Sequence, residues 1–460
     1  MTLATHPTDS EVDAEAFPAD FVFGTATAAY QIEGAVAEGG RGPSIWDTFS
    51  HQRGRTVNGE NGDVACDHYH RWQEDVDLMA ELGLRGYRLS LSWSRLQPLG
   101  RGPLNPAGVA FYRSLLTRLR DRGIEPLVTL YHWDLPQPLE DAGGWPARIT
   151  ALRFAKYAAK VTAALGDLAT RWVTLNEPWC SAFLGYETGA HAPGRTRLRD
   201  AVQAAHHLNV AHGLAVRAIR AVNPRLEVGV ALLLTDLHPA SSSQADVDAT
   251  ERVDVNQNLM FLEPVLGRGY SAAVRRQYGR LGLDDVLLPD DEAVIGAPID
   301  FLGVNHYHRN VVRAAPDDGH LAARQDAADP ATTSLGWSVR PDALLSTLQR
   351  VASMTDLPLY VTESGASFDD RRDDAGRVDD PARIEYLGKY LGAAAQACRD
   401  GVNLRGYYVW SFMDNFEWAE GYAPRFGLVH VDYATQLRTP KASASWYGAL
   451  IASHTRTVGA

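Results

Sequence analysis

The chain has 460 residues, of which 45% are hydrophobic and 22% are charged. This composition is ordinary for a globular protein, and a chain of this length can bury a large core without disulfides. The formal net charge of −12 argues against a nucleic-acid partner, because binding to the phosphate backbone requires basic patches. The three cysteines, Cys66, Cys180 and Cys398, are a poor disulfide framework and fit a reducing compartment.

The N-terminal segment, residues 1–16, is polar and acidic and has no basic start followed by an apolar stretch, so it does not resemble a secretory signal. No apolar run reaches the roughly 18 residues that a transmembrane helix needs. We therefore predict a cytoplasmic protein that does not associate with membranes. Residues 1–16 are expected to form a flexible extension, and residues 17–455, which contain no Gly/Ser- or Pro-rich linker, to form one folded domain.

Short, mainly apolar runs recur along the chain, as expected for parallel strands that are covered on both faces. In chain order, the predicted strands are residues 21–25, 86–92, 126–131, 172–176, 228–234, 299–305, 359–362 and 407–411. Helical periodicity lies between them, most clearly at residues 74–82, 154–165, 201–222 and 381–399. The last of these segments begins with a proline, which is common at a helix start.

Eight strands alternating with helices predict an α/β fold, a single (β/α)8 TIM barrel with extended loops at its C-terminal face. The same periodicity is compatible with an open doubly wound sheet, but the count of eight and the placement of polar residues favour the barrel. The fifth and sixth predicted strands start 71 residues apart, so we expect an insertion after the fifth strand. Residues 314–333, which are polar and rich in Asp and Ala, are predicted to form a long surface loop.

Polar and aromatic residues gather at the carboxyl ends of the predicted strands, where a barrel of this kind carries its site. His132, Asn176, Glu177, Asn305, Tyr307 and Glu363 follow or end such strands, and Trp410 lies in the eighth. Arg88, inside the second predicted strand, needs an anionic partner because an unpaired buried charge is costly. Two carboxylates delivered to one point by distant strands are what cleavage of a glycosidic bond requires.

The segments Asn176-Glu177-Pro178 and Glu363-Ser364-Gly365 resemble the paired signatures of family 1 glycoside hydrolases, the β-glucosidase family. The resemblance covers nearly the whole chain, through motifs at residues 21–34, 87–93, 130–136, 191–194, 410–418 and 425–427. It implies a retaining exo-β-glycosidase that hydrolyses terminal non-reducing β-D-glucosyl residues through a covalent glycosyl-enzyme intermediate. β-Galactosides and β-fucosides are further candidate substrates.

The resemblance also implies roles for matching residues. Glu177 matches the general acid/base and Glu363 the nucleophile, and we expect their carboxyl groups to lie roughly 5–5.5 Å apart. Arg88, Asn305 and Tyr307 match the polar shell around the nucleophile. The residues that would contact the substrate are Gln31, His132, Asn176, Asn305, Tyr307, Glu417 and Trp418, with Trp410 as the floor under the sugar and Trp337 and Phe426 lining the leaving-group pocket.

Two positions depart from the pattern of the family. The nucleophile motif usually reads Glu-Asn-Gly, whereas Ser364 stands here in the middle position. After the sixth strand, His306 separates Asn305 from Tyr307, where a tyrosine is common. Both departures leave the matched functional atoms in place.

Neither a metal nor a cofactor is expected for this reaction. Residues 66–70 contain Cys66, His68 and His70, but in no standard zinc spacing. The histidines of the predicted helix 201–222, namely His206, His207 and His212, are interpreted as solvated or capping, and Cys180 as packing near the pocket. The expected partner is a small β-glycoside or a short β-linked oligosaccharide, as in cellobiose degradation.

Two other functions stay open on the sequence. A non-catalytic sugar-binding protein on the same scaffold would usually lack one of the two glutamates, and both are present. A glycosyltransferring enzyme would form the same covalent intermediate, and would differ only in how well water competes with a second sugar. The sequence also leaves the oligomeric state open.

Overall fold

The structure, a computed structural model, describes residues 12–328 and 332–458. Its centre is a closed barrel of eight parallel strands in the order β1-β11-β10-β7-β5-β4-β3-β2. The barrel strands are β1 (Val22–Ala26), β2 (Gly86–Ser90), β3 (Glu125–Tyr131), β4 (Arg171–Asn176), β5 (Glu227–Leu233), β7 (Phe301–Asn305), β10 (Leu359–Ser364) and β11 (Leu404–Trp410).

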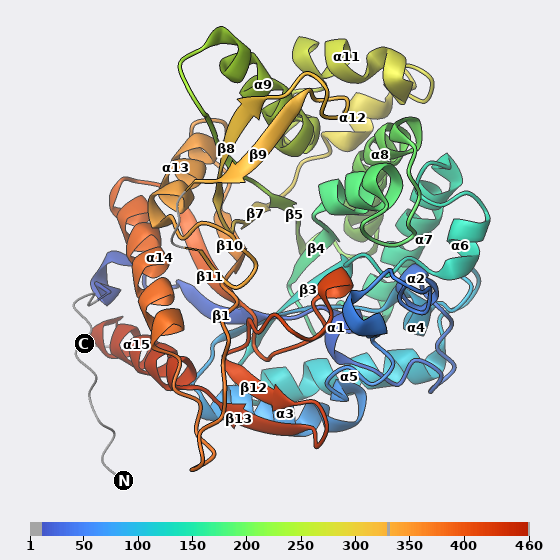
Figure 1. The fold of residues 1–460 in the computed structure, drawn as a ribbon. Helices are drawn as coiled ribbons and strands as arrows, with labels where there is room; N and C mark the ends of the chain where they lie inside the picture. Colours follow the sequence, from blue (N-terminus) through green and yellow to red (C-terminus); the bar gives the residue numbers. More distant parts are fainter. Residues whose placement is uncertain (1–11, 329–331, 459–460) are drawn as a thin grey trace.

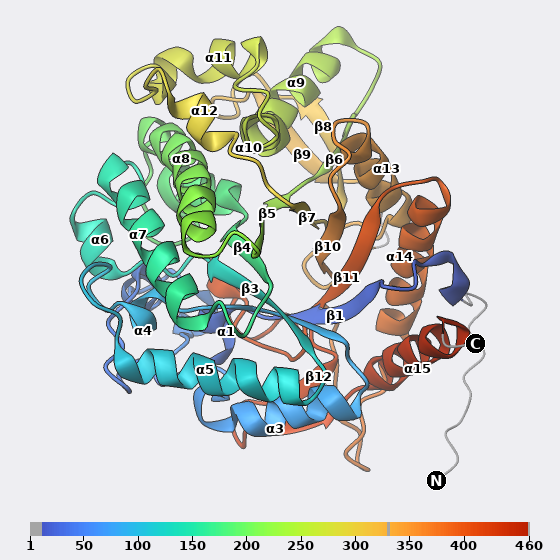
Figure 2. The same cartoon turned by 180° about the vertical axis from the view of Figure 1, so that it is seen from behind.

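The barrel confirms the predicted fold class and all eight predicted strands. The first strand pairs with β2 on one side and with β11 on the other, so the alternative of an open sheet is wrong. Most of the strand residues are buried, which explains why these segments are almost continuously apolar in the sequence. Figures 1 and 2 look along the barrel from its two ends and show the helices arranged around it.

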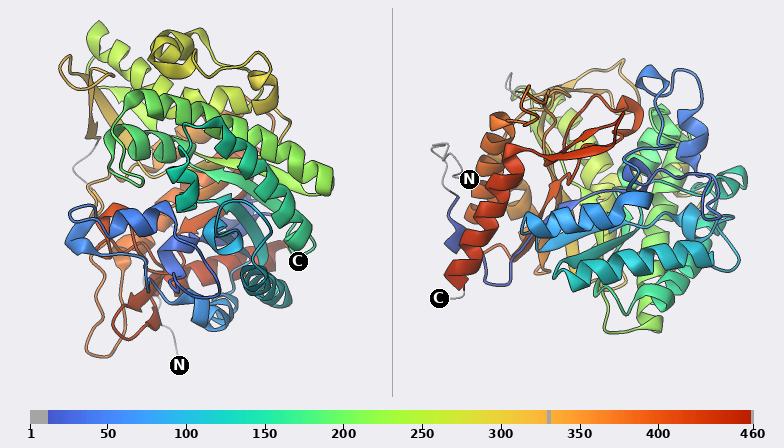
Figure 3. Two further views of the ribbon diagram at one scale, coloured as in Figure 1. Left: turned by 90° about the vertical axis from the view of Figure 1, so that its right-hand side faces the viewer. Right: turned by 90° about the horizontal axis from the view of Figure 1, so that it is seen from below.

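Long helices follow most of the strands and cover the outside of the barrel. They are α3 (His68–Glu81), α5 (Pro106–Asp121), α7 (Arg148–Leu165), α8 (Leu198–Val222), α13 (Pro341–Ala352), α14 (Pro381–Arg399) and α15 (Ala442–Val458). The four predicted helical segments lie in α3, α7, α8 and α14 and are confirmed. Helices α7 and α8 pack against each other on the outer surface (Figure 3).

Shorter elements fill the connections at the carboxyl ends of the strands. They are the helices α1 (Ala29–Ile32), α2 (Ile45–Ser50), α4 (Trp93–Leu96) and α6 (Gln137–Asp141), the π-helix Cys180–Thr188 and the hairpin of β12 (Val429–Asp432) with β13 (Leu437–Pro440). These short elements belong to the extended loops that the sequence predicts at the C-terminal face of the barrel.

The expected insertion after the fifth strand is present. It contains β6 (Asp236–Pro239), α9 (Gln244–Asp254), α10 (Met260–Val265), α11 (Ala272–Tyr278), α12 (Asp291–Ile295) and the π-helices Val255–Leu259 and Gly279–Leu283. After β7, the strands β8 (Arg309–Ala314) and β9 (Ala323–Ala327) join β6 in a three-stranded sheet. The prediction of a loop over residues 314–333 is therefore wrong for β9, which pairs antiparallel with β8; residues 329–331 lie outside the described part.

The histidines of α8 also differ from their interpretation. His206, His207 and His212 are all buried rather than solvated, because this helix packs against α7, α10 and α12. His206 contacts Asp291 and His212 contacts Thr174, each through a ring nitrogen. Among the described residues, no group of three or more His, Cys, Asp or Glu side chains could hold a metal ion.

The ends of the domain pack on the barrel where the structure describes them. Residues 1–11 of the predicted extension lie outside the described part. Residues Ala14–Ala16 form a 3-10 helix, in which Ala14 is buried and its carbonyl contacts His454 of α15. In the described chain, no helix is both long and apolar enough to span a membrane.

Candidate active site

A cavity of about 650 Å³ opens at the carboxyl ends of the barrel strands. This volume is within the range of ligand-binding pockets in proteins. Nine of the residues singled out from the sequence line it, namely His132, Glu177, Tyr307, Trp337, Glu363, Trp410, Glu417, Trp418 and Phe426. The remaining four, Gln31, Arg88, Asn176 and Asn305, are fully or almost fully buried directly behind these lining residues and bond to them.

Glu363 is the penultimate residue of β10 and is held by two donors. Arg88 of β2 donates through Nη1 to Oε1 of Glu363, and the Tyr307 hydroxyl donates to Oε2 over 2.6 Å. Arg88 thus has the anionic partner that its buried position requires. Donors on both oxygens stabilise the carboxylate form and fix its orientation.

A glycine lets β10 deliver Glu363 to this position. A Cβ atom on Gly365 would lie 1.7 Å from the backbone oxygen of Trp410 at the end of β11. Only a residue without a side chain allows the two strand ends to approach so closely. In the Glu-Ser-Gly sequence, Glu363 therefore provides the carboxyl group, and Gly365, two residues later, allows the ends of β10 and β11 to pack closely.

Glu177 directly follows β4 and has a positive φ of 43°, a conformation that is uncommon for residues other than glycine. Its Oε1 accepts a hydrogen bond from Asn305 Nδ2 at 2.7 Å, and its Oε2 accepts one from the Cys180 thiol at 3.2 Å. Burial and the neighbouring charge of Glu363 raise the pKa of Glu177 well above that of an ordinary carboxyl. This side chain is therefore suited to carry a proton at neutral pH.

Three amide and guanidinium groups connect the two carboxyl groups. Arg88 donates to Glu363 through Nη1 and to Asn176 Oδ1 through Nη2, and Asn305 Nδ2 donates to both Asn176 Oδ1 and Glu177. Residue Asn305 also pairs with Glu363 in the register of β7 and β10. The barrel thereby brings together two glutamates that are far apart in the sequence.

Around the two glutamates, the cavity wall combines a third carboxyl group with aromatic rings. Burial and the charges of Glu363 and Glu177 raise the pKa of Glu417 to about 8. The His132 ring stacks between Trp410 and Trp418, with centroids 5.9 and 5.8 Å away. Burial and the nearby Arg88 lower the pKa of His132, so its imidazole is neutral.

The inner wall also offers an unused acceptor. Gln31 Nε2 donates to Asn415 Oδ1, to the Phe416 carbonyl and, at 3.4 Å, to Glu417 Oε2. Its Oε1 is buried and has no hydrogen-bond partner among the described residues. A ligand hydroxyl would satisfy this atom.

The outer wall is aromatic. Trp337 packs against Tyr307, His308 and Phe426, with ring centroids 5.2, 5.2 and 5.9 Å apart. Flat, apolar and neutral surfaces of this kind, next to carboxyl and amide groups, are suited to a sugar ring, which has an apolar C–H face and a polar rim.

Comparison with known proteins also indicates an enzyme that acts on sugars. The family model described as Glycosyl hydrolase family 1 matches residues 13–456. The chain belongs to this family. A β-glucosidase from an Agrobacterium species is 44% identical to it, over 96% of this chain and 97% of the relative. A bifunctional β-D-glucosidase/β-D-fucosidase from Bifidobacterium breve is also 44% identical, over 95% of this chain and 98% of the relative.

Solved structures have the same fold as this family 1 hydrolase. The AHE enzyme from Alicyclobacillus herbarius has a TM-score of 0.93 at 51% identity, covering 95% of this chain and 98% of that chain. The psychrophilic β-glucosidase BglU from Micrococcus antarcticus has a TM-score of 0.92 at 45% identity, with the same coverage of both chains.

Several cavity residues of this family 1 hydrolase were missed by the sequence analysis. They are Trp133, Trp179, Leu184, His191, Leu233, Thr235, Gln257, His308, Asn310, Gln325, Ser334, Leu335 and Glu420. Trp133 and His191 were within reach, since they lie in motifs already noted at residues 130–136 and 191–194. Gln257 lies in the insertion, which was predicted only from the spacing of the fifth and sixth strands, so no site residue was assigned there.

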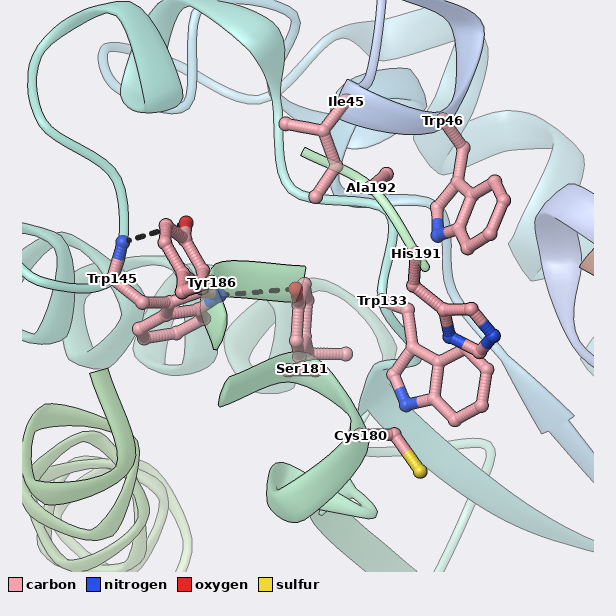
Figure 4. Close-up of a pocket in the computed structure, with 10 residues that line it drawn as sticks. Ile45, Trp46, Trp133, Trp145, Cys180, Ser181, Tyr186, His191 and Ala192 are labelled. Atoms are coloured by element: carbon pink, nitrogen blue, oxygen red, sulfur yellow. Dashed lines mark hydrogen bonds between the residues drawn. The ribbon is translucent and has the colours of Figure 1, made fainter. Parts of the chain in front are cut away.

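Behind the active site of the hydrolase lies a tightly packed aromatic wall. Figure 4 shows Trp46, Trp133, Trp145 and Tyr186 together with Cys180 on the π-helix Cys180–Thr188. The gaps between these side chains are too narrow for a water molecule. The wall therefore acts as a rigid support for the residues next to Glu177 rather than as a second binding site.

Proposed function

We propose that this family 1 hydrolase is a retaining exo-β-glucosidase with Glu363 as the nucleophile and Glu177 as the general acid/base. The observation that carries the proposal is the different surroundings of two carboxyl groups in one cavity. Glu363 is stabilised as a carboxylate by Arg88 and Tyr307, whereas the pKa of Glu177 is raised by burial and by the charge of Glu363. Paired groups of this kind can divide acid and base roles between them.

In the first step, a Glu363 oxygen attacks the anomeric carbon of the β-glucoside and the bond from that carbon to the leaving-group oxygen breaks. The electron pair of the broken bond goes to that oxygen, which takes the proton of Glu177. Glu177 is then ionised and removes a proton from water, whose oxygen displaces Glu363 from the anomeric carbon. Two displacements at one carbon retain the β configuration and require no metal or cofactor.

The remaining cavity residues would hold the sugar during these steps. Gln31, His132, Asn176, Glu417 and Trp418 bind its hydroxyls, and Trp410 stacks against its C–H face. The buried, unpartnered Oε1 of Gln31 and the neutral ring of His132 support this assignment, since both can pair with neutral hydroxyls. Trp337 and Phe426 contact the leaving group.

The substrate class follows from the charge of the pocket and from the relatives. The cavity is lined by the Glu363 carboxylate and, among the described residues, by no Lys or Arg side chain that could pair with a phosphate, so neutral glucosides are preferred over 6-phosphoglucosides. The Thermotoga maritima β-glucosidase, whose structures include complexes with deoxynojirimycin and glucoimidazole, is 41% identical to this chain. Residues 17–455 form the catalytic domain in this proposal, which acts in the cytoplasm on cellobiose and on similar short β-linked oligosaccharides.

A panel of 4-nitrophenyl β-glycosides tests the substrate assignment. The specificity constants for the glucoside, the fucoside and the galactoside should all be higher than the specificity constant for the 6-phosphoglucoside. Following the glucoside reaction by proton NMR tests the stereochemistry, because a retaining enzyme releases β-glucose before mutarotation forms the α anomer. Initial release of α-glucose, or faster turnover of the phosphorylated sugar, would contradict the proposal.

A further inference from the structure

Strand β10 has an irregular register with its neighbour β7 just before Glu363 (Figure 1). Val361 pairs with Val304. Glu363 pairs with Asn305, so β10 has one residue more than β7 between these two pairs. The extra residue is Thr362. A bulge of this kind breaks the alternation of side chains along a strand, and bulges often redirect side chains next to active sites.

Both polar groups of Thr362 contact residues of the active site. Its carbonyl accepts a hydrogen bond from Arg88 Nη1 at 3.1 Å, and its hydroxyl donates to Asn305 Oδ1 at 2.7 Å. Arg88 also donates to Glu363, and Asn305 Nδ2 donates to Glu177 at 2.7 Å. The bulge residue therefore touches both of the groups that hold the two proposed catalytic carboxyls.

Thr362 lies behind the cavity rather than in its wall. The residue is fully buried, and the side chains that line the cavity in the described chain do not include it. A glycine of β7 makes room for it, because a Cβ atom on Gly303 would lie 2.7 Å from Thr362 Oγ1 and 2.8 Å from its Cγ2. Any effect of Thr362 on the reaction must therefore pass through the residues that it contacts.

The orientation of the Asn305 amide follows from its partners. A guanidinium group can only donate, so Asn176 turns its Oδ1 toward Arg88. Asn305 then presents its Nδ2 to this same oxygen, at 2.9 Å, and to Glu177. The Asn305 Oδ1 is left facing Thr362, whose hydroxyl is the only hydrogen-bond donor to that oxygen within the described residues.

Loss of this hydroxyl would leave Asn305 Oδ1 buried without a donor, which is costly. Turning the amide over would bring Oδ1 to Glu177, and a carboxyl group can donate to it only while it is protonated. The present orientation instead supplies a donor to Glu177, which favours the ionised form that removes a proton from water in the second step.

We propose that Thr362 is a positioning residue of the active site, whose hydroxyl holds the Asn305 amide so that Nδ2 faces Glu177. This role rests on the proposed function, because Thr362 acts through the acid/base Glu177. The bulge in β10 makes the role possible, since two successive residues of one strand, Thr362 and Glu363, both reach active-site partners.

Replacing the hydroxyl by a methyl group in Thr362→Val tests the proposal. The substrate is phenyl β-glucoside, whose leaving group departs poorly without a proton, so kcat/KM falls on the alkaline side as Glu177 ionises. In Thr362→Val this alkaline limb should move upward by roughly 0.5–1 pH unit, the size expected when one hydrogen bond to the ionised carboxyl is lost. Thr362→Ala also lacks the hydroxyl and should shift the limb in the same direction, so either variant alone decides the question.

Two further variants separate positioning from a merely structural role. Thr362→Ser keeps the hydroxyl and should leave the alkaline limb where it lies in the wild-type enzyme. Thr129→Val makes the same chemical change in β3, at a fully buried hydroxyl without a hydrogen-bond partner among the described residues, and should not move the limb. A loss of stability alone would lower the amount of folded enzyme without shifting its pH profile.

The other titratable groups around Glu177 are unchanged in all of these variants. They are Arg88, Cys180, Tyr307, Glu363 and Glu417. The contact of Arg88 with Thr362 is also kept, because it uses the backbone carbonyl. A shift of the limb therefore reports the hydrogen bond from Asn305 to Glu177.

The outcomes distinguish this role from the proposed function. An unmoved limb in Thr362→Val and Thr362→Ala would overturn the positioning role, and so would an equal shift in Thr362→Ser or Thr129→Val. If the proposed function itself were wrong, the wild-type enzyme would not hydrolyse phenyl β-glucoside at all.

Discussion

At the scale of single residues, the raised pKa of Glu177 sets a direction for the pH dependence of activity. The first step needs the protonated acid, so kcat/KM should fall as the pH rises through the pKa of Glu177 in the free enzyme. In Glu177→Ala this alkaline limb should disappear, and kcat/KM for cellobiose should fall by about 10²–10⁴-fold. In the same variant, kcat/KM for a 2,4-dinitrophenyl glucoside should fall much less, because its leaving group needs no proton. An equal fall in kcat/KM for both substrates would argue against the acid role.

The thiol of Cys180 gives a second prediction at this scale. It donates to Oε2 of Glu177 over 3.2 Å and thereby favours the ionised form of that carboxyl. Cys180→Ala should therefore move the alkaline limb of kcat/KM upward by roughly 0.5–1 pH unit, the size expected for one hydrogen bond. Cys398→Ala removes a partly buried cysteine of α14 and serves as the control. An unchanged limb in Cys180→Ala would show that the thiol only fills space.

Sequence reasoning singled out thirteen candidate site residues but missed contacts of this kind. His132, Glu177 and Glu363 could be chosen because they end or follow strands, and strand ends meet in a closed barrel. Others, such as Gln31 and Trp337, came from the resemblance to the family. The contact between Cys180 and Glu177 depends instead on the backbone turn after β4, where Glu177 takes a positive φ and a π-helix begins at Cys180. Neither feature has a signature in the local sequence.

At the scale of elements, the end of β10 leaves no room for an added side chain at Gly365. Gly365→Ala would place a methyl group 1.7 Å from the backbone oxygen of Trp410, which cannot move without shifting β11. The strand end carrying Glu363 should be displaced instead, and a shift of about 1 Å can cost roughly 100-fold in rate. We expect at least this loss in kcat/KM together with a lower melting temperature.

Gly392 in α14 provides the matched control for this substitution. A Cβ atom there would have no neighbour within 4 Å, so Gly392→Ala should leave activity unchanged and stabilise the helix by up to about 1 kcal/mol. If Gly365→Ala retained full activity, the close approach of the two strand ends would not be needed to position Glu363.

The elements also show which patterns a sequence makes visible. The barrel strands are buried on both faces, so most of them are short, mainly apolar runs in the sequence. Strand β9 has the sequence Ala-Arg-Gln-Asp-Ala and only exposed or half-buried residues, so it has no apolar alternation and its sequence predicts a loop. Its strand conformation comes from pairing with β8 rather than from its own residues.

At the scale of the whole molecule, a buried ionic network joins segments that follow different strands. Lys441 is fully buried and donates to Asp370 at 2.5 Å and to Asp414 at 2.7 Å, while Arg383 of α14 also contacts Asp370. Asp370 follows β10, Asp414 follows β11, and Lys441 directly precedes α15. The network therefore links the two loops after these strands to the start of α15.

Removing the lysine should therefore destabilise the fold. Lys441→Met leaves two buried carboxylates short of a partner, which typically costs about 3–5 kcal/mol, and the melting temperature should fall accordingly. Lys389→Met removes an exposed pair with Glu385 and should cost no more than about 0.5 kcal/mol. Similar melting temperatures for the two variants would contradict the role given to the network.

The central claim of this account is that Glu363 forms the covalent bond to the sugar, and Glu363→Gly tests it most directly. On an activated aryl β-glucoside, this variant should be almost inactive alone and should regain turnover when azide fills the space left by the carboxylate. The product should be the α-glucosyl azide, because a single displacement inverts the anomeric carbon. Full activity without azide, or a β-glucosyl azide as the product, would contradict the assignment of Glu363 as the nucleophile.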